Sequence, residues 1–292
     1  MRMLREQLLR HIETLCHPRN PIRHAQEWEA TQNYLVDQLN EMDRDVLFQD
    51  FSTDLAGPDD EPVIGRNVLG EATEEASLII VAHYDTVDDS PGADDNLSAV
   101  SVALEVARRC PNVHVLFPDL EEFGLQGSRH FVSSGKWSKL PALVLESVGY
   151  WTDSPNSQSF PEVFPVAFPR HFEWLKERSF RGDFWALLHL PVDRALADTL
   201  GEELADSALS LVVPEALLQQ EEGQALRDFG RSDHLAFWER GRSCLMLTDS
   251  ANFRNPNYHL PSDTADTLNL DEMERLTERL VSWCSTLPLA VR

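Results

Sequence analysis

Basic residues are scarce in this sequence, and lysine is nearly missing. Only three of the 25 Lys and Arg residues are lysines, whereas Asp and Glu number 49, so the formal net charge of the 292-residue chain is −24. A surface with this excess of carboxylates repels nucleic-acid phosphates and anionic lipid headgroups. We therefore expect neither nucleic acid nor a membrane as a partner.

Long apolar runs and cysteine motifs are missing as well. No run approaches the roughly 18 apolar residues that a membrane-spanning helix needs, and residues 1–21 lack the apolar core of a secretory signal. The sequence therefore predicts a cytoplasmic protein. The four cysteines are scattered and form no CxxC pair, which argues against a zinc ribbon or a redox pair and favours free thiols.

Apolar runs alternate with segments of helical spacing along most of the chain. Hydrophobic residues make up 42% of the sequence, which is enough for a folded core. The patterns predict helices at 3–16, 25–41, 97–109 and 270–287, and strands at 46–51, 67–69, 78–82, 113–117, 142–145 and 243–248. Because strands alternate with helices, we expect the α/β class, with a mostly parallel twisted sheet flanked by helices.

Residues 151–230 interrupt this alternation. They are rich in proline and in aromatic residues, among them Phe160, Phe164, Phe168 and Trp185, and a helix is expected only near 192–207. We interpret the segment as a cap or lid inserted into a single catalytic domain that spans residues 1–292. Its aromatic side chains either form the wall of a substrate pocket or pack on the surface, and the sequence alone favours neither.

Imidazole and carboxylate groups follow the predicted buried strands. At four successive strand ends, or in the loop directly after them, the chain places His83 with Asp85, Glu121 with Glu122, Glu146, and His259. A further carboxylate, Asp95, precedes the helix predicted at 97–109. Ligands of open α/β sheets bind outside the carboxyl ends of the strands, so we expect these side chains to meet at one edge of the sheet.

This set of side chains suits two zinc ions. Zinc accepts imidazole nitrogen and carboxylate oxygen, and a catalytic site keeps one position for water. Two metal ions about 3.5–4 Å apart can hold both an attacking water and the substrate oxygen, provided that one carboxylate bridges them. The charge of two Zn²⁺ ions balances four carboxylates, which without metal would repel one another. The candidates are His83, Asp95, Glu121, Glu122, Glu146 and His259.

Taken in order, the motifs around these residues resemble a known family. They are HYD at 83–85, PGADDN at 91–96, EEFGLQGS at 121–128, LESVGY at 145–150, SDH at 232–234 and NYHLPSDTADTL at 257–268. The chain resembles the dizinc exopeptidases that include bacterial leucyl aminopeptidases (metallopeptidase family twenty-eight), whose superfamily also contains glutaminyl cyclases. The resemblance covers about residues 62–149 and 230–285, and it implies a zinc exopeptidase-like phosphorylase/hydrolase fold.

The resemblance also implies a role for each metal ligand. Asp95 would bridge two zinc ions, Glu122 and His259 would complete one site, and His83 and Glu146 would complete the other. Many relatives carry Asp where this chain has Glu146, so the second site is the one in which the geometry is expected to differ.

Three further residues receive roles from the resemblance. Glu121 would be the general base, and Tyr258 would donate a hydrogen bond to the developing oxyanion. Asp85 would orient His83 through a hydrogen bond, as carboxylates commonly do for metal-bound imidazoles. The implied activity is that of a hydrolase, a zinc aminopeptidase that removes the N-terminal residue of short peptides.

Three other functions stay open at this point. The chain could be a glutaminyl cyclase-like acyltransferase with one zinc, which should not need both His83 and Glu146 as ligands. It could be a dizinc deacylase or carboxypeptidase, although the GADDN and EEFGLQGS motifs fit the aminopeptidase type better. It could also be a binding protein without activity, but such a protein would be expected to lack ligands, and none is missing here.

Overall fold

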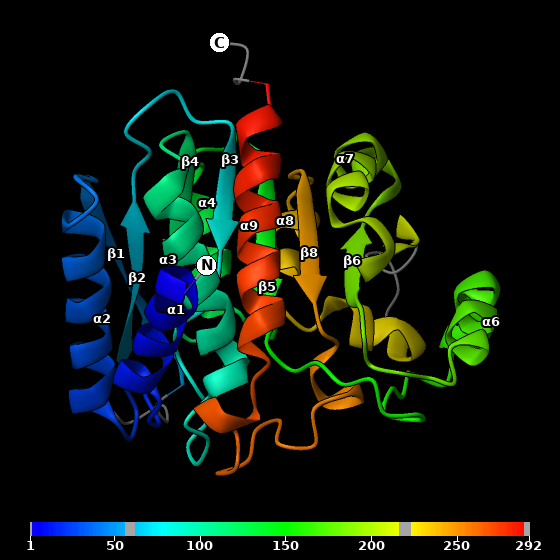
Figure 1. Cartoon of the computed structure of the whole chain (residues 1–292). Coiled ribbons are helices and arrows are strands. Elements are labelled where there is room, and N and C mark those ends of the chain that lie inside the picture. Colours follow the sequence, from blue (N-terminus) through cyan, green and yellow to red (C-terminus); the bar gives the residue numbers. More distant parts are fainter. Residues whose placement is uncertain (1, 56–61, 216–222, 289–292) are drawn as a thin grey trace.

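The computed structural model describes residues 2–55, 62–215 and 223–288, which form three layers with a sheet between two groups of helices (Figure 1). The described strands make one eight-stranded sheet in the order β1-β2-β4-β3-β5-β8-β6-β7. Their bounds are β1 Val46–Thr53, β2 Val63–Gly70, β3 Leu78–Val81, β4 Val113–Phe117, β5 Ala142–Glu146, β6 Trp185–His189, β7 Ala208–Val212 and β8 Cys244–Thr248.

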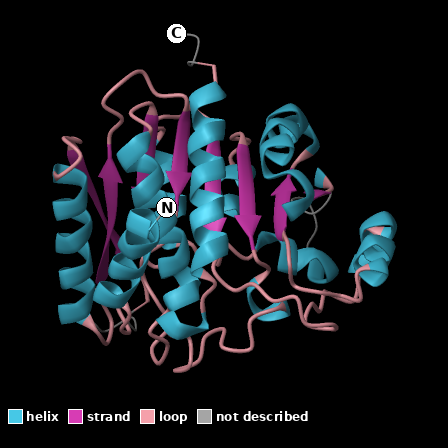
Figure 2. Ribbon diagram, in the orientation of Figure 1, coloured by secondary structure: helices cyan, strands magenta, loops and turns pink. Residues whose placement is uncertain are grey.

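The helices cover both faces of this sheet (Figure 2). One apolar core joins α1, α3, α7 and α9 to one face, and a second core joins α4, α6 and α8 to the other. The helix bounds are α1 Arg2–Leu15, α2 Ala25–Asn40, α3 Ala99–Arg109, α4 Gln126–Ser134, α5 Phe164–Ala167, α6 Pro169–Glu177, α7 Arg194–Leu204, α8 His234–Glu239 and α9 Leu270–Thr286. Within the described part of the chain, no helix is both long and apolar enough to cross a membrane.

The α/β class predicted from the sequence is confirmed, and the centre of the sheet is parallel. β4, β3, β5 and β8 run in the same direction, so their carboxyl ends lie at one edge of the sheet. The strands outside this centre change direction, because β2 is antiparallel to β4 and β6 is antiparallel to β8. The four central strands are almost fully buried and, apart from His114, Glu146 and Thr248, apolar, as expected for strands that are covered on both faces.

The segment at 151–230, interpreted from the sequence as an inserted cap or lid, contributes strands to the sheet itself. β6, α7 and β7 lie within this segment, and β6 and β7 extend the sheet beyond β8. The run at 185–189 is a fully buried strand, whose apolar pattern is hidden in the sequence by the aromatic residues before it. Of the described remainder, α6 lies at the end of the sheet that carries β6 (Figure 1).

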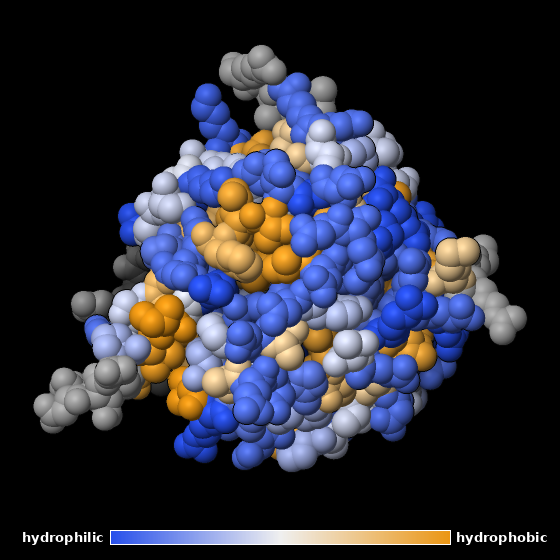
Figure 3. All heavy atoms as spheres, turned by 90° about the vertical axis from the view of Figure 1, so that its left-hand side faces the viewer, coloured by the Kyte–Doolittle hydropathy of each residue, from blue (hydrophilic) through white to orange (hydrophobic). Residues whose placement is uncertain are grey.

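The opposite end of the sheet finishes at β1. Figure 3 views this side, which is mainly hydrophilic with smaller hydrophobic patches. Asp50 of β1 lies opposite Arg66 of β2, and their side chains form an ion pair. The Arg66 guanidinium also lies 4.8 Å from the centre of the exposed Phe48 ring. Charged groups of this kind make an edge strand a poorer template for pairing with another chain.

Candidate metal centre

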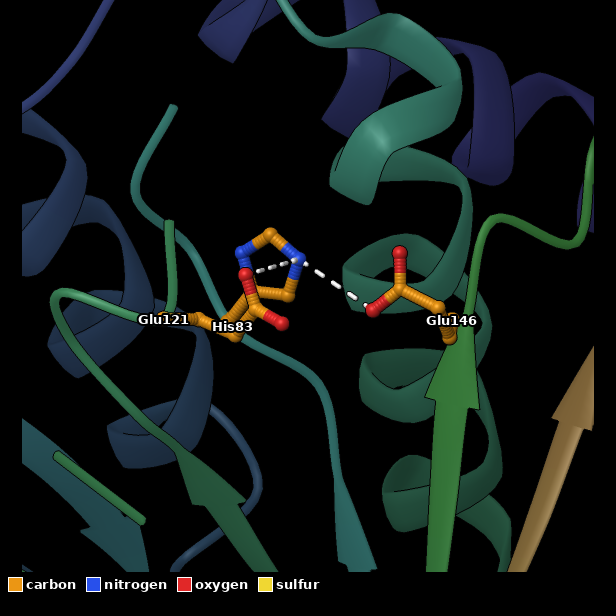
Figure 4. Close-up of side chains that lie close together, drawn as sticks. All are labelled: His83, Glu121 and Glu146. Carbon is orange, nitrogen blue, oxygen red and sulfur yellow. Dashed lines mark ion pairs between the residues drawn. The ribbon is translucent and has the colours of Figure 1, made fainter. Parts of the chain in front are cut away.

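Six candidate side chains converge at the carboxyl ends of β3, β4, β5 and β8. They form two groups whose potential ligand atoms lie within 4.8 Å of one another: His83, Glu121 and Glu146 in the first, and Asp95, Glu122 and His259 in the second. In the first group, His83 Nε2 lies 3.4 Å from Glu146 Oε2 and 3.9 Å from Glu121 Oε2, with the two carboxylates on different sides of the imidazole (Figure 4). In the second group, His259 Nε2 lies 3.1 Å from Glu122 Oε2.

Asp95 lies between the two groups. Its Oδ1 is 3.2 Å from His83 Nε2, and its Oδ2 is 3.0 Å from His259 Nε2. Each oxygen of one carboxylate therefore faces a different imidazole, which is the arrangement that a bridging ligand needs. Asp95 Oδ1 is also closer to His83 than Glu121 is, so the geometry lets Asp95 complete the first group and leaves Glu121 beside it.

Asp85 holds the loop that carries the two glutamates. Its Oδ1 accepts a hydrogen bond from the Glu121 N–H at 3.0 Å, and its Oδ2 accepts one from the Glu122 N–H at 3.2 Å. Asp85 Oδ1 also lies 3.5 Å from His83 Nδ1. One fully buried carboxylate thus contacts both the imidazole after β3 and the loop after β4, a wider role than the orientation of His83 that the sequence predicts.

The loop that carries Asp95 is held from both sides. The Asp263 carboxylate accepts the N–H groups of Asp94 and Asp95 at 2.9 and 3.2 Å. Asn96 donates to the Leu145 carbonyl at 3.0 Å and accepts the Ser147 N–H, also at 3.0 Å. These bonds connect the Asp95 loop to the end of β5, where Glu146 lies.

The carboxylates of this centre are buried close to one another, and this changes their pKa values. Burial raises the pKa of Glu122 to about 8, and the Asp95 charge adds to this effect. Burial also raises the pKa of Glu121 well above its usual value, and repulsion from Glu146 adds to the effect although His83 opposes it. Burial lowers the pKa of His259, but the close Asp95 and Glu122 carboxylates outweigh that effect and bring the pKa to about 10. The cluster therefore retains protons that bound cations would displace.

Several buried polar atoms of this cluster have no hydrogen-bond partner. They are Nδ1 and Nε2 of His83, Oδ1 of Asp95, Oε1 of Glu122 and Nε2 of His259. Buried polar groups are rarely left unpaired in native proteins, and an ion is one of the usual reasons when they are. Because the orphaned atoms are imidazole nitrogens and carboxylate oxygens, they suit a divalent ion such as zinc.

A cavity of about 500 Å³ opens beside the cluster. Glu121, Glu122, Glu146, Tyr258 and His259 lie at its polar end, and its apolar wall includes Phe160, Phe164, Phe184, Leu188, Leu211 and Met246. Of the four aromatic residues singled out from the sequence, Phe160 and Phe164 line this cavity. Phe168 packs behind Phe164, whereas Trp185 belongs to the core on the opposite face of the sheet.

Tyr258 borders the cluster from the loop after β8. Its ring is stacked on the His259 ring, with centroids 3.8 Å apart, and its hydroxyl accepts a hydrogen bond from Arg231 Nη2 at 3.3 Å. Burial raises the pKa of Tyr258 far above its usual value, and the neighbouring Asp95 and Glu122 charges reinforce the shift. The phenol therefore stays protonated and can donate a hydrogen bond into the cavity.

The family model of peptidase family M28 matches residues 63–161 and 194–284, which is more than half of the chain and includes every residue of the cluster. The chain belongs to peptidase family M28. The membership predicted from the motifs is thereby confirmed.

This M28 chain is similar to several bacterial proteins in sequence or in fold. The chain is 29% identical over 249 residues to the uncharacterized protein YfbL of Escherichia coli, a match that covers 76% of the chain and 72% of YfbL. It is 27% identical over 217 residues to the aminopeptidase YwaD of Bacillus subtilis, which covers 68% of the chain but only 38% of YwaD. The crystal structure of the Legionella pneumophila LapA aminopeptidase has the same fold, with a TM-score of 0.67 at 18% identity, over 99% of the chain and 73% of LapA.

Two contributions to the centre of this M28 chain were not expected from the sequence. Ser232 donates its hydroxyl to Glu146 Oε2 at 2.7 Å, and Arg231 contacts Tyr258 as described above. Both precede the SDH motif residue His234, whose Nε2 instead lies 2.8 Å from the Phe229 carbonyl, away from the cluster. Ser232 is the first residue of the SDH motif and Arg231 directly precedes it, so this motif is the signal that could have pointed to them.

Proposed function

We propose that this protein is an aminopeptidase that hydrolyses the N-terminal peptide bond of short peptides and uses two zinc ions. The observation that carries the proposal is the position of Asp95, with one carboxylate oxygen toward each imidazole group and with Glu121 beside the pair. The orphaned nitrogen and oxygen atoms of the cluster support a metal as the missing partner.

The residues divide into ligands and reacting groups. His83 and Glu146 would hold one ion, Glu122 and His259 the other, and Asp95 both. When bound, two zinc ions lower the pKa of water and polarise the substrate carbonyl. Glu121 is not needed as a ligand in this arrangement, so it is free to accept the proton of the attacking water and to pass it to the departing amine. Tyr258 donates its hydroxyl hydrogen to the carbonyl oxygen, where negative charge develops.

The carboxylates and the cavity set the requirements for the substrate. Glu121 and Glu146 lie where they can accept hydrogen bonds from a free α-amine, and the apolar wall of the cavity suits the first side chain. An acetylated amine would leave these buried acceptors unpaired, at about 1–3 kcal/mol for each. We therefore propose that a free N-terminus is required.

Metal analysis combined with paired substrates tests this function. We expect two divalent ions per chain, loss of activity on chelation, and recovery with zinc or cobalt. A free dipeptide amide should be cleaved, and its N-acetylated form should be cleaved far more slowly. Full activity after exhaustive removal of metal would contradict the proposal, and faster cleavage of the acetylated peptide would favour a deacylase or carboxypeptidase. One ion per chain together with cyclisation of an N-terminal glutamine would indicate a glutaminyl cyclase.

A further inference from the structure

An exposed arginine lies beside the cavity, whose polar end carries three glutamates. Among the described residues that line the cavity, Arg129 and Arg231 carry positive charge. Arg129 is paired with Glu239 at 3.3 Å. Arg231 is the one that reaches the reacting groups, through its hydrogen bond to the Tyr258 hydroxyl.

The contacts of Arg231 do not use its full capacity for hydrogen bonds. Its Nη1 donates to Asn252 Oδ1 at 2.9 Å and lies 3.6 Å from Asp228 Oδ1. The Arg231 side chain is 43% exposed, so water can satisfy the donors that these contacts leave free. A guanidinium has five N–H donors in a planar fork that matches a carboxylate, and Arg231 therefore keeps donors that a ligand in the cavity can use.

An anionic group of a ligand is repelled in these surroundings unless such a donor pairs with it. The net charge is −24, and Glu121, Glu122 and Glu146 line the same cavity. A free carboxylate of a substrate would be repelled here unless a cation stood close to it. A positive side chain at this place therefore points to a negative group on the ligand.

The spacing of groups along a peptide substrate identifies that negative group. If the Tyr258 hydroxyl bonds the carbonyl oxygen of the first substrate residue, the Arg231 guanidinium is close to the next residue, because its Nη2 lies 3.3 Å from the phenol oxygen. Successive Cα atoms of a peptide are about 3.8 Å apart, so the carboxylate that ends the second residue lies within reach. Each additional residue moves the terminal carboxylate by up to about 3.3–3.6 Å and takes it away from Arg231.

We propose that Arg231 binds the terminal carboxylate of a dipeptide substrate and so makes this protein selective for dipeptides. The inference rests on the proposed aminopeptidase function, because it uses the same position of the scissile bond. Arg231 acts here as a specificity residue, in addition to its contact with Tyr258.

The test compares substrates that differ only beyond the scissile bond. We expect the metal-loaded enzyme to cleave Leu-Ala with a kcat/KM about 10–100-fold above that for Leu-Ala amide or Leu-Ala-Ala. Arg231→Gln should remove or reverse this preference, and Arg231→Lys should retain part of it. Asp228→Asn should increase the preference, since it removes a competing anion. Arg240→Gln is the matched control because Arg240, which donates to Ser133, does not line the cavity.

The ratio of kcat/KM for Leu-Ala to kcat/KM for Leu-Ala amide separates this role from the contact with Tyr258. If Arg231→Gln acts only through Tyr258, it lowers both rates equally, and that result would overturn the inference. Equal rates for the two substrates in the unaltered enzyme would overturn it as well. Equilibrium binding to Glu121→Gln gives a second readout, in which Leu-Ala should bind at least tenfold more tightly than its amide. If the unaltered enzyme cleaves no peptide, the proposed function fails, and this binding ratio still decides whether Arg231 recognises a carboxylate.

Discussion

Glu121 and Glu122 are neighbours in the chain, yet they face different partners. Their N–H groups are bound by the two oxygens of Asp85, and this fixes the direction in which each side chain leaves the loop. Glu122 approaches His259 to 3.1 Å, whereas Glu121 stays 3.9 Å from His83. One peptide unit thus separates a group with the geometry of a ligand from a group that lies next to the ligands.

Replacing Glu121 by Gln should separate catalysis from metal binding. The amide keeps the size of the side chain but cannot accept the proton of water, so we expect kcat to fall by about 10²–10⁴-fold while metal content stays unchanged. Glu122→Gln is the matched variant and should lose metal. The assignment would be reversed if Glu121→Gln lost an ion, as measured by metal analysis of the purified variants.

Replacing Asp85 by Asn should weaken metal binding without removing a ligand. One end of the amide is a donor and cannot accept the N–H groups of both glutamates, so the loop and His83 lose their alignment. Changes of this kind cost about 10–100-fold in metal affinity or activity. Competition with a chromophoric chelator measures the affinity. Asp89→Asn, at an exposed position of the following loop, should leave it unchanged, and an unaltered affinity in Asp85→Asn would contradict the alignment role.

The order of motifs was sufficient to single out His83, Asp95, Glu121, Glu122, Glu146 and His259, which the structure brings together. Each stands after a buried apolar strand or in a distinctive motif, so it has a local signal. Their individual roles stay predictions. Arg231, Ser232 and Asp263 contact the same cluster or its loops. Ser232 and Asp263 lie within quoted motifs, but their partners are distant in the sequence, so the motifs alone did not assign these contacts.

At the scale of secondary-structure elements, short buried strands were easier to predict where helices separate them clearly. Ile79 and Val144 lie in runs without polar residues, and both strands were predicted within about one residue of their bounds. β6 was missed because Phe184 and Trp185 continue the aromatic pattern of the segment before it. Trp185 packs against Trp151 in the core and not against the cavity. Residue type alone does not distinguish such a core aromatic from one that lines a substrate pocket.

Phe160 offers a test of the apolar wall of the cavity. It is partly buried, and its ring packs against Phe164, Phe172 and Phe180. Phe160→Ala should change the relative kcat/KM for substrates that begin with Leu, Phe or Ala, because the apolar surface for the first side chain is altered. Metal content should stay the same. Phe48→Ala, on the exposed edge strand β1, is the control, and an unchanged ranking in Phe160→Ala would place specificity elsewhere.

At the scale of the whole molecule, two apolar cores enclose the sheet, and the ionisable groups trapped within them link stability to pH. His234 at the start of α8 is fully buried. Burial lowers its pKa to about 4, although its bond to the Phe229 carbonyl opposes the shift. In the unfolded chain a histidine has a pKa near 6.5. Between these two values the unfolded state binds a proton that the folded state excludes.

Acid should therefore destabilise the protein through His234. Its contribution is complete above about pH 6.5 and is lost as the pH falls toward 4, since proton binding then favours the unfolded chain. Between pH 7.5 and pH 5 the free energy of unfolding falls in the unaltered protein. In His234→Gln this fall should be smaller by about 2 kcal/mol, because the variant lacks the titrating imidazole. Urea titrations in the presence of chelator measure this difference. His130→Gln, at an exposed position of α4, should show no such difference, and equal losses in both variants would contradict the assignment.

The ligand groups come from one edge of the sheet, but along the chain they extend from residue 83 to residue 259. During synthesis on the ribosome, His83 emerges long before its neighbours across the sheet, and His259 follows only after β8 has been made. A nascent chain that stops before this loop has at most one of the two imidazoles in place. The proposed site that contains His259 can therefore bind an ion only after β8 and the loop that follows it have been made, whereas the residues of the other group are all present once β5 has been made.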